Sequence, residues 1–263
     1  CVDSENLKNL VRLSYFVSEI SNMVHRNDQP YVGSSSFAHK GGVHINAVMK
    51  NPKTYEHIDP SLVGNRRKIL VSELSGKSSI VIRAKNLDLD LKKEDKTTQK
   101  ILKLIQSLEH KGYQFEAAEA SFELLLKKAL RQYKKFFELE SFRVVVEKQK
   151  NKKVTSEAII KLKVNNITEH TAAEGDGPVN ALDNALRKAL KNFYPILSEM
   201  KLSDFKVRVL DATEGTAAKV RVLIESQDKK DTWSTVGVSE NIIEASWQAL
   251  VDSIEYKLLK DSK

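Results

Sequence analysis

Apolar side chains recur every three or four positions through the first part of the chain, which is the spacing of one face of an α-helix. Residues 5–24 show it clearly, and Pro30 marks where this helix has ended, because proline lacks the amide hydrogen that a helix needs. The same spacing predicts four later helices, over 44–50, 71–86, 97–111 and 115–138.

Two segments between these helices have the composition of loops. Residues 31–42 are rich in Ser and Gly, and we expect an ordered loop there. Residues 53–70 contain two turn signals, Asp59-Pro60 and Gly64-Asn65. Gly112 is predicted to end the helix over 97–111, since glycine readily takes the left-handed conformation that follows a helix.

Near residue 140 the pattern changes to the short apolar runs of β-strands. We predict strands over 142–146 and 157–164, a third that ends near Ala173, and a helix over 179–192. The same plan then repeats, with strands over 205–210, 216–224 and 233–236 and a helix over 242–258.

This duplication predicts an α+β fold in two parts: mainly helical subdomains over 1–139, followed by a domain over 140–263 built from two βββα units. Each unit has one apolar sheet face and one apolar helix face, and packing the two units together would bury both.

Composition narrows the class of protein. Of the 263 residues 41% are hydrophobic and 30% charged, which is typical of a soluble globular protein, and no apolar run is long enough to span a membrane. The single cysteine, Cys1, excludes an intrachain disulfide and a cysteine-built metal site and fits a cytoplasmic location. There is no secretory signal at the start, and because the first residue is not Met we expect that the natural start has been removed.

A net charge of +8 and a pI near 9.3 raise nucleic acid as a partner. The lysines are interleaved with acidic residues, as over 92–96, and the aromatic residues occupy core positions instead of alternating with Lys and Arg on one face. This pattern favours a solvated basic surface. A basic α+β nucleic-acid-binding module stays open as an alternative, and it predicts binding with a steep salt dependence.

The densest cluster of chemically active residues lies over 34–44 and contains His39 and His44. Two histidines five positions apart do not share a helix face, so a metal pair on one helix is not expected. His44 would lie at the start of a helix, where the helix dipole favours a neutral imidazole that acts as a base or hydrogen-bonding partner. The alternative is a purely structural loop.

A second candidate is the turn Gly175-Asp-Gly-Pro178, which opens the helix over 179–192. Its backbone amides could hold a carboxylate or phosphate, or the glycines could simply serve a strand-to-helix turn. It is not a P-loop, because no Gly-Lys-Ser/Thr follows. No nucleophile elbow, zinc-protease motif or dinucleotide fingerprint occurs, so the chain is not expected to contain a complete active site.

Several long motifs resemble the citramalate synthase branch of the alpha-isopropylmalate and homocitrate synthase family. The run from His39 to His44, His-Lys-Gly-Gly-Val-His, replaces the His-Ser-Ser-Gly-Ile-His of isopropylmalate synthases and favours that branch. The resemblance covers essentially the whole chain. The matching stretches are 36–60, 62–65 and 72–77, and, for a LeuA-type allosteric and dimerisation domain, 175–181, 209–211, 215–222 and 236–247.

The resemblance implies an acyltransferase reaction in which acetyl-CoA condenses with pyruvate to give citramalate and CoA. The family's divalent metal and most of its catalytic residues belong to a TIM barrel that this chain lacks, so neither metal nor cofactor is expected in this part. The chain alone would be inactive, and His44 matches the histidine that the family contributes from its linker to a neighbouring active site.

For the second domain the resemblance implies a homodimer that binds a branched-chain amino acid. The effector would be isoleucine for a citramalate synthase, or leucine if the chain is instead the regulatory part of an alpha-isopropylmalate synthase. An apolar cleft would take the side chain of the amino acid, and the backbone amides of a turn would bind its carboxylate. By match, the pocket consists of Gly177, Pro178, Val179, Leu210, Asp211 and Ala212.

Overall fold

The computed structural model of the 263-residue chain describes residues 3–21, 23, 25–69, 81, 84–85, 96–210, 212–229 and 231–262. It divides the chain into two compact units, Cys1–Gln106 and Ser107–Lys263. This division comes earlier than the expected one at 139–140, because the helix α6 (Glu119–Ala129) packs on elements of the second repeat. The helix expected over 71–86 lies, except for positions 81, 84 and 85, outside the described residues.

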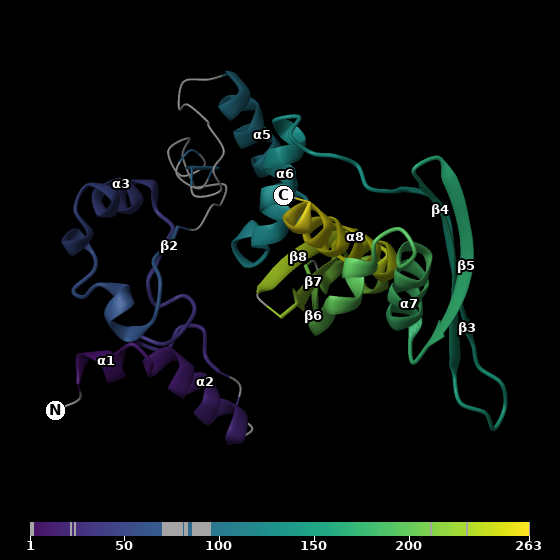
Figure 1. Ribbon diagram of the computed structural model, residues 1–263, viewed down its shortest axis with the longest axis horizontal. Coiled ribbons are helices and arrows are strands. Elements are labelled where there is room, and N and C mark those ends of the chain that lie inside the picture. The colour runs from purple at the N-terminus through teal and green to yellow at the C-terminus, as the bar shows by residue number, and fades with distance from the viewer. Residues whose placement is uncertain are drawn as a thin grey trace. The chain divides into compact units, whose positions relative to one another are not determined.

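The first unit is made of short helices joined by turns (Figure 1). The single helix expected over 5–24 is interrupted at Lys8 and ends at Ile20, whereas the short helix expected over 44–50 is confirmed. Two parallel two-residue strands tie the loop to the chain that follows it. The elements are α1 (Ser4–Leu7), α2 (Leu10–Ile20), β1 (Ala38–His39), α3 (Gly42–Lys50), the 3-10 helices η1 (Pro52–Thr54) and η2 (Pro60–Val63), β2 (Lys68–Ile69) and α5 (Lys96–His110), which continues into the second unit.

The Ser- and Gly-rich loop is ordered, as its composition indicated. The side-chain amide of Asn65 donates hydrogen bonds to the carbonyl oxygens of Tyr31 and Gly33, at 2.7 and 3.1 Å. The turn before Asn65 needs glycine: Gly64 has a φ of +72°, and a Cβ there would lie 2.1 Å from the carbonyl oxygen of Lys8. The loop and the turn-rich segment therefore hold each other in place.

The stretch after α5 corrects one prediction. Gly112 follows the end of α5 with a φ of +108°, as expected for a residue that stops a helix. The helix predicted over 115–138, however, is much shorter. A 3-10 turn η3 (Phe115–Ala117) precedes α6, which ends at Ala129. The next segment leaves the helix at Arg131, with a φ of +58°, and buries Phe136 and Phe137 in the core of the repeats. Packing of these two rings overrides the helical spacing of the apolar residues.

The remaining chain forms the two predicted βββα units, which confirms the α+β fold class. Each unit contributes a three-stranded antiparallel sheet, in the order β3-β4-β5 and β6-β7-β8, followed by a helix. Several boundaries differ from the predicted ones: β3 and β6 begin earlier, at Glu138 and Lys201, whereas β7 begins later, at Val220. Residues 216–217 belong to the 3-10 helix η5 (Ala212–Ala217). The elements are β3 (Glu138–Glu147), β4 (Thr155–Val164), β5 (Ile167–Gly175), α7 (Pro178–Leu190), η4 (Pro195–Glu199), β6 (Lys201–Val209), β7 (Val220–Gln227), β8 (Thr232–Ser239) and α8 (Ile242–Asp261).

The two βββα repeats share one hydrophobic core. Helix α7 lies on β4 and β5, and α8 lies on β7 and β8, while the two helices also contact each other (Figure 1). The ring of Phe142 on β3 packs against Trp247 of α8, with centroids 5.4 Å apart, so the first sheet is covered partly by the helix of the second unit. Small residues allow this close approach: Ala245 and Ala249 on α8 are fully buried.

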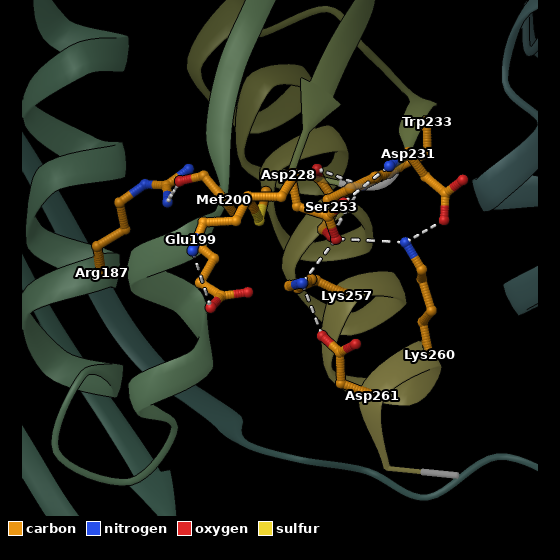
Figure 2. Close-up of polar contacts among 11 residues, drawn as sticks. Arg187, Glu199, Met200, Asp228, Asp231, Trp233, Ser253, Lys257, Lys260 and Asp261 are labelled. Carbon is orange, nitrogen blue, oxygen red and sulfur yellow. Dashed lines mark hydrogen bonds and ion pairs between the residues drawn. The ribbon is translucent and has the colours of Figure 1, made fainter.

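A polar network fastens the end of α8 to the turn between β7 and β8. Lys257, although only 2% exposed, has its Nζ 2.6 Å from a carboxylate oxygen of Asp228 and 2.8 Å from one of Asp261 (Figure 2). Lys260 contacts the same oxygen of Asp228 at 3.2 Å and Asp231 at 2.5 Å. Burial of Lys257 is tolerated because the carboxylates of Asp228 and Asp261 neutralise its charge.

Candidate functional sites

His44 lies in the first turn of α3, the position expected from the sequence. Helix α3 follows Gly41 as its N-cap and is held by the buried side chains of Ile45 and Val48. The imidazole is exposed and packs on the ring of Tyr55, with centroids 4.3 Å apart. The helix therefore presents His44 on its outer surface, where the imidazole is free to hydrogen-bond a group outside this unit.

His39 has a different environment, because its side chain is nearly buried. Its Nε2 lies 2.9 Å from Oε1 of Glu56, and the guanidinium of Arg67 donates two hydrogen bonds to the same carboxylate, at 2.7 and 2.5 Å. The hydrogen bonds from Arg67 hold the pKa of Glu56 below its usual range. His39 thus connects β1 to the turn-rich segment. Glu56 was not singled out in the sequence, since nothing in the local pattern identifies its partners.

The first half of the predicted effector pocket is the turn before α7. Gly177 is the N-cap, with no side-chain cap, and Pro178 is the first residue of the helix. Val179 is half-buried and packs against the core. A Cβ added to Gly177 would meet nothing within 4 Å, so there is open space at the helix start, where amide groups and the helix dipole favour a carboxylate.

The second half of the predicted pocket follows β6. The Leu210 amide donates to the carbonyl oxygen of Lys219 at 2.9 Å, and its side chain lies against Gly112. Ala212 begins η5, and Asp211 lies outside the described residues. The contacts described for Leu210 are thus with Lys219 and with the segment after α5, and not with the turn at Gly177. The sequence identified Gly112 only as a helix end.

No group of three or more His, Cys, Asp or Glu side chains in the described ranges is arranged to hold a metal ion. No helix of those ranges is both long and apolar enough to cross a membrane. Within the described residues, the two predicted sites offer an exposed imidazole on one unit and an open helix start on the other.

Two family models match this chain, over different parts of it. The model of the LeuA allosteric (dimerisation) domain matches residues 116–258, which include both βββα repeats. The chain belongs to this family. A second model, described as a homocitrate synthase post-HMGL domain-like family, matches residues 31–112, which include His44. The two matches meet near Gly112, close to the division between the compact units.

Individual relatives agree with this assignment. The chain is 55% identical over 264 residues to an (R)-citramalate synthase of Geobacter sulfurreducens and 53% identical over 263 residues to one of Aquifex aeolicus, covering 100% of this chain in each case. A 2-isopropylmalate synthase of Methanocaldococcus jannaschii is 30% identical over 97% of the chain. The chain spans about half the length of these relatives: 50%, 50% and 47%.

Proposed function

We propose that the whole protein is a citramalate synthase, which condenses acetyl-CoA with pyruvate to give citramalate and CoA. In this proposal the present chain supplies regulation and dimerisation. The observation that carries it is the match of the LeuA model to residues 116–258, within a chain that is 55% identical, over its full length, to an (R)-citramalate synthase. The divalent metal of the reaction would be held by the other half of the protein.

The effector of this domain is proposed to be isoleucine. Support comes from the open helix start at Gly177, which can take a carboxylate, beside the half-buried apolar Val179. The Leu210–Ala212 segment would complete the cleft after a rearrangement or from a second copy, with Asp211 as the partner of the ammonium group. Inhibition would then require the effector to prefer one arrangement of the regulatory domain against the catalytic half.

A homodimer is supported by the description of the matched family and by one face of β6. Phe205, Val207 and Val209 alternate on the side of the sheet that also carries the buried Val222 and Ile224, yet all three are exposed. The equivalent strand of the first repeat, β3, has its Phe142 covered by Trp247 of α8. By analogy between the repeats, the exposed β6 face would be covered by a second copy.

His44 is proposed to act in a catalytic site of the longer protein and not within this chain. Its exposure, and its separation from the buried pair of His39 and Glu56, support this role. The imidazole could accept or donate a hydrogen bond at the reacting groups.

The test is calorimetric titration of the longer protein and of this chain with isoleucine, leucine and valine. Saturable heat with isoleucine, together with pyruvate-dependent release of CoA that isoleucine inhibits, is the expected result. Binding of leucine alone would assign the chain to an alpha-isopropylmalate synthase instead. Dimers with no response to any of the three amino acids would reduce the domain to an assembly scaffold and defeat the regulatory proposal.

A further inference from the structure

Helix α2 (Leu10–Ile20) exposes a continuous apolar stripe. Leu13, Phe16, Val17 and Ile20 are 55, 60, 55 and 70% exposed. They are spaced three, four and seven positions apart, so they lie on one face of the helix. Four large apolar side chains in one stripe exceed the scattered exposure that is normal for a protein surface.

The opposite face of α2 packs on its own unit although it is the more polar of the two. Leu10, Val11, Ser14 and Ser18 are half-buried there, and the Ser14 hydroxyl is 2.9 Å from Nε2 of His25. A surface helix normally places its apolar stripe toward the core and its polar residues outward. This helix instead keeps four of its large apolar side chains exposed, which indicates that its outer face is covered by something else.

The family matches indicate what covers it. The post-HMGL model begins at residue 31 and the LeuA model at residue 116, so α2 precedes both. The first of these domains is named for following an HMGL domain, and the matched relatives are about twice as long as this chain. A helix that comes before the post-HMGL domain is therefore adjacent in sequence to the half of the relatives that this chain does not cover.

We infer that the stripe of Leu13, Phe16, Val17 and Ile20 is a docking surface for the catalytic half of the longer protein. The occupant is an apolar patch of that half, because the stripe itself offers no charged group for recognition. Helix α2 then joins the two halves, and the unit that carries His44 is held against the catalytic half by this contact. The inference rests on the proposed function only in assuming that the longer protein has a catalytic half.

The test compares Val17→Asp with Val154→Asp in the longer protein and in this chain alone. Val154 is the matched control, since it is the same residue type, is 51% exposed and precedes β4. We expect Val17→Asp to lower the unfolding midpoint of the longer protein by several degrees, because it would bury a charge, while Val154→Asp has little effect. In this chain alone, neither variant should change the midpoint appreciably.

A measurement without a variant guards against misfolding. In the wild-type proteins, amide hydrogens of residues 10–21 should exchange at least about tenfold more slowly in the longer protein than in this chain. Equal exchange, or equal midpoints for both variants in the longer protein, would overturn the inference. Three results in this chain alone would also overturn it: protection of the helix from exchange, a loss of stability in Val17→Asp, or a loss of self-association in Val17→Asp. Each of these would mean that the second unit or a second copy of this chain covers the stripe.

Turnover with acetyl-CoA and pyruvate is measured separately on the wild-type longer protein. Its absence would reject the proposed reaction and leave the docking result readable from exchange and stability.

Discussion

The side chain of Leu210 lies directly against the backbone of Gly112, and a Cβ built on Gly112 would stand 2.2 Å from Leu210 Cδ1. Arg221 of β7 reinforces the contact, because its Nε donates to the Gly112 carbonyl oxygen at 2.6 Å and its second nitrogen donates to Gln114 at 2.7 Å. The chain that follows α5 is thus fastened to the second repeat, beside the segment proposed to contact the effector. Any displacement of Leu210 would therefore change the packing around Gly112, just after the end of α5.

Gly112→Ala should destabilise this chain by about 1–3 kcal/mol, since its φ of +108° is unfavourable for alanine and the new methyl overlaps Leu210. Urea unfolding of the isolated chain measures this loss. Gly177→Ala is the control, because its φ of −161° suits any residue and its Cβ would meet nothing within 4 Å. A stability loss as large for Gly177→Ala would contradict this explanation.

Gly177→Ala has a second expected effect, on the effector. The added methyl would occupy the open space at the start of α7, so isoleucine should bind at least about tenfold more weakly while stability falls by no more than about 1 kcal/mol, the cost of alanine at an N-cap. Titration calorimetry of the variant checks the affinity. Unchanged affinity would place the effector away from this helix start.

Substitutions of His39 and His44 should have different effects, one on stability and the other on turnover. His44→Ala removes an exposed ring, so stability should change by less than about 0.5 kcal/mol while turnover of the longer enzyme falls by about 10²-fold or more. His39→Ala should instead cost about 1–3 kcal/mol, because Glu56 loses a buried hydrogen-bonding partner. Turnover and urea unfolding are the two measurements. Full turnover in His44→Ala would make His44 a structural residue.

Asp252 on α8 should give the second unit a pH dependence. Burial raises the pKa of Asp252 to about 6, even though Lys128 and a hydrogen bond from Ser121 oppose that rise and Glu255 adds to it. The folded state therefore holds this proton more tightly than the unfolded chain, whose aspartates have a pKa of about 3.9. The stability contributed by the protonated group is present at low pH and is lost as the pH rises through about 6.

Asp252→Asn removes this titration. Between pH 5 and pH 7.5 the variant should gain about 1 kcal/mol relative to the unmodified chain, measured as the difference in free energy of unfolding at each pH. A difference that is the same at both pH values would show that Asp252 stays ionised in the folded protein across this range.

The buried pair of Lys257 and Asp228 should be costly to break from one side. Lys257→Met leaves the Asp228 carboxylate with Lys260 as its remaining cation among the described contacts, and we expect a loss of about 2–4 kcal/mol in urea unfolding. Lys135→Met breaks an exposed pair with Glu138 and should cost less than about 1 kcal/mol. Equal losses for the two variants would contradict the role assigned to burial.

The sequence by itself determined the order of elements in the second unit. Alternation of apolar residues is a local signal, and so are Gly175 and Pro178, which mark the turn from strand to helix. Each strand and helix of the repeats was therefore predicted to within a few residues. The position of His44 at a helix start was also a local property, since Gly41 and Gly42 precede an apolar helical run. The motif around His44 identified the family for the same reason: its residues are contiguous in the chain.

Only the tertiary structure decided which distant residues meet. Helical spacing predicted a helix through residue 138, but α6 ends at Ala129. Burying Phe136 and Phe137 in the shared core stabilises the fold more than further turns of α6 would. Likewise, Leu210 against Gly112 and Glu56 between His39 and Arg67 are pairings across long stretches of chain, which no local pattern encodes. Periodicity identifies an apolar face, but what covers that face depends on the packing of the whole molecule.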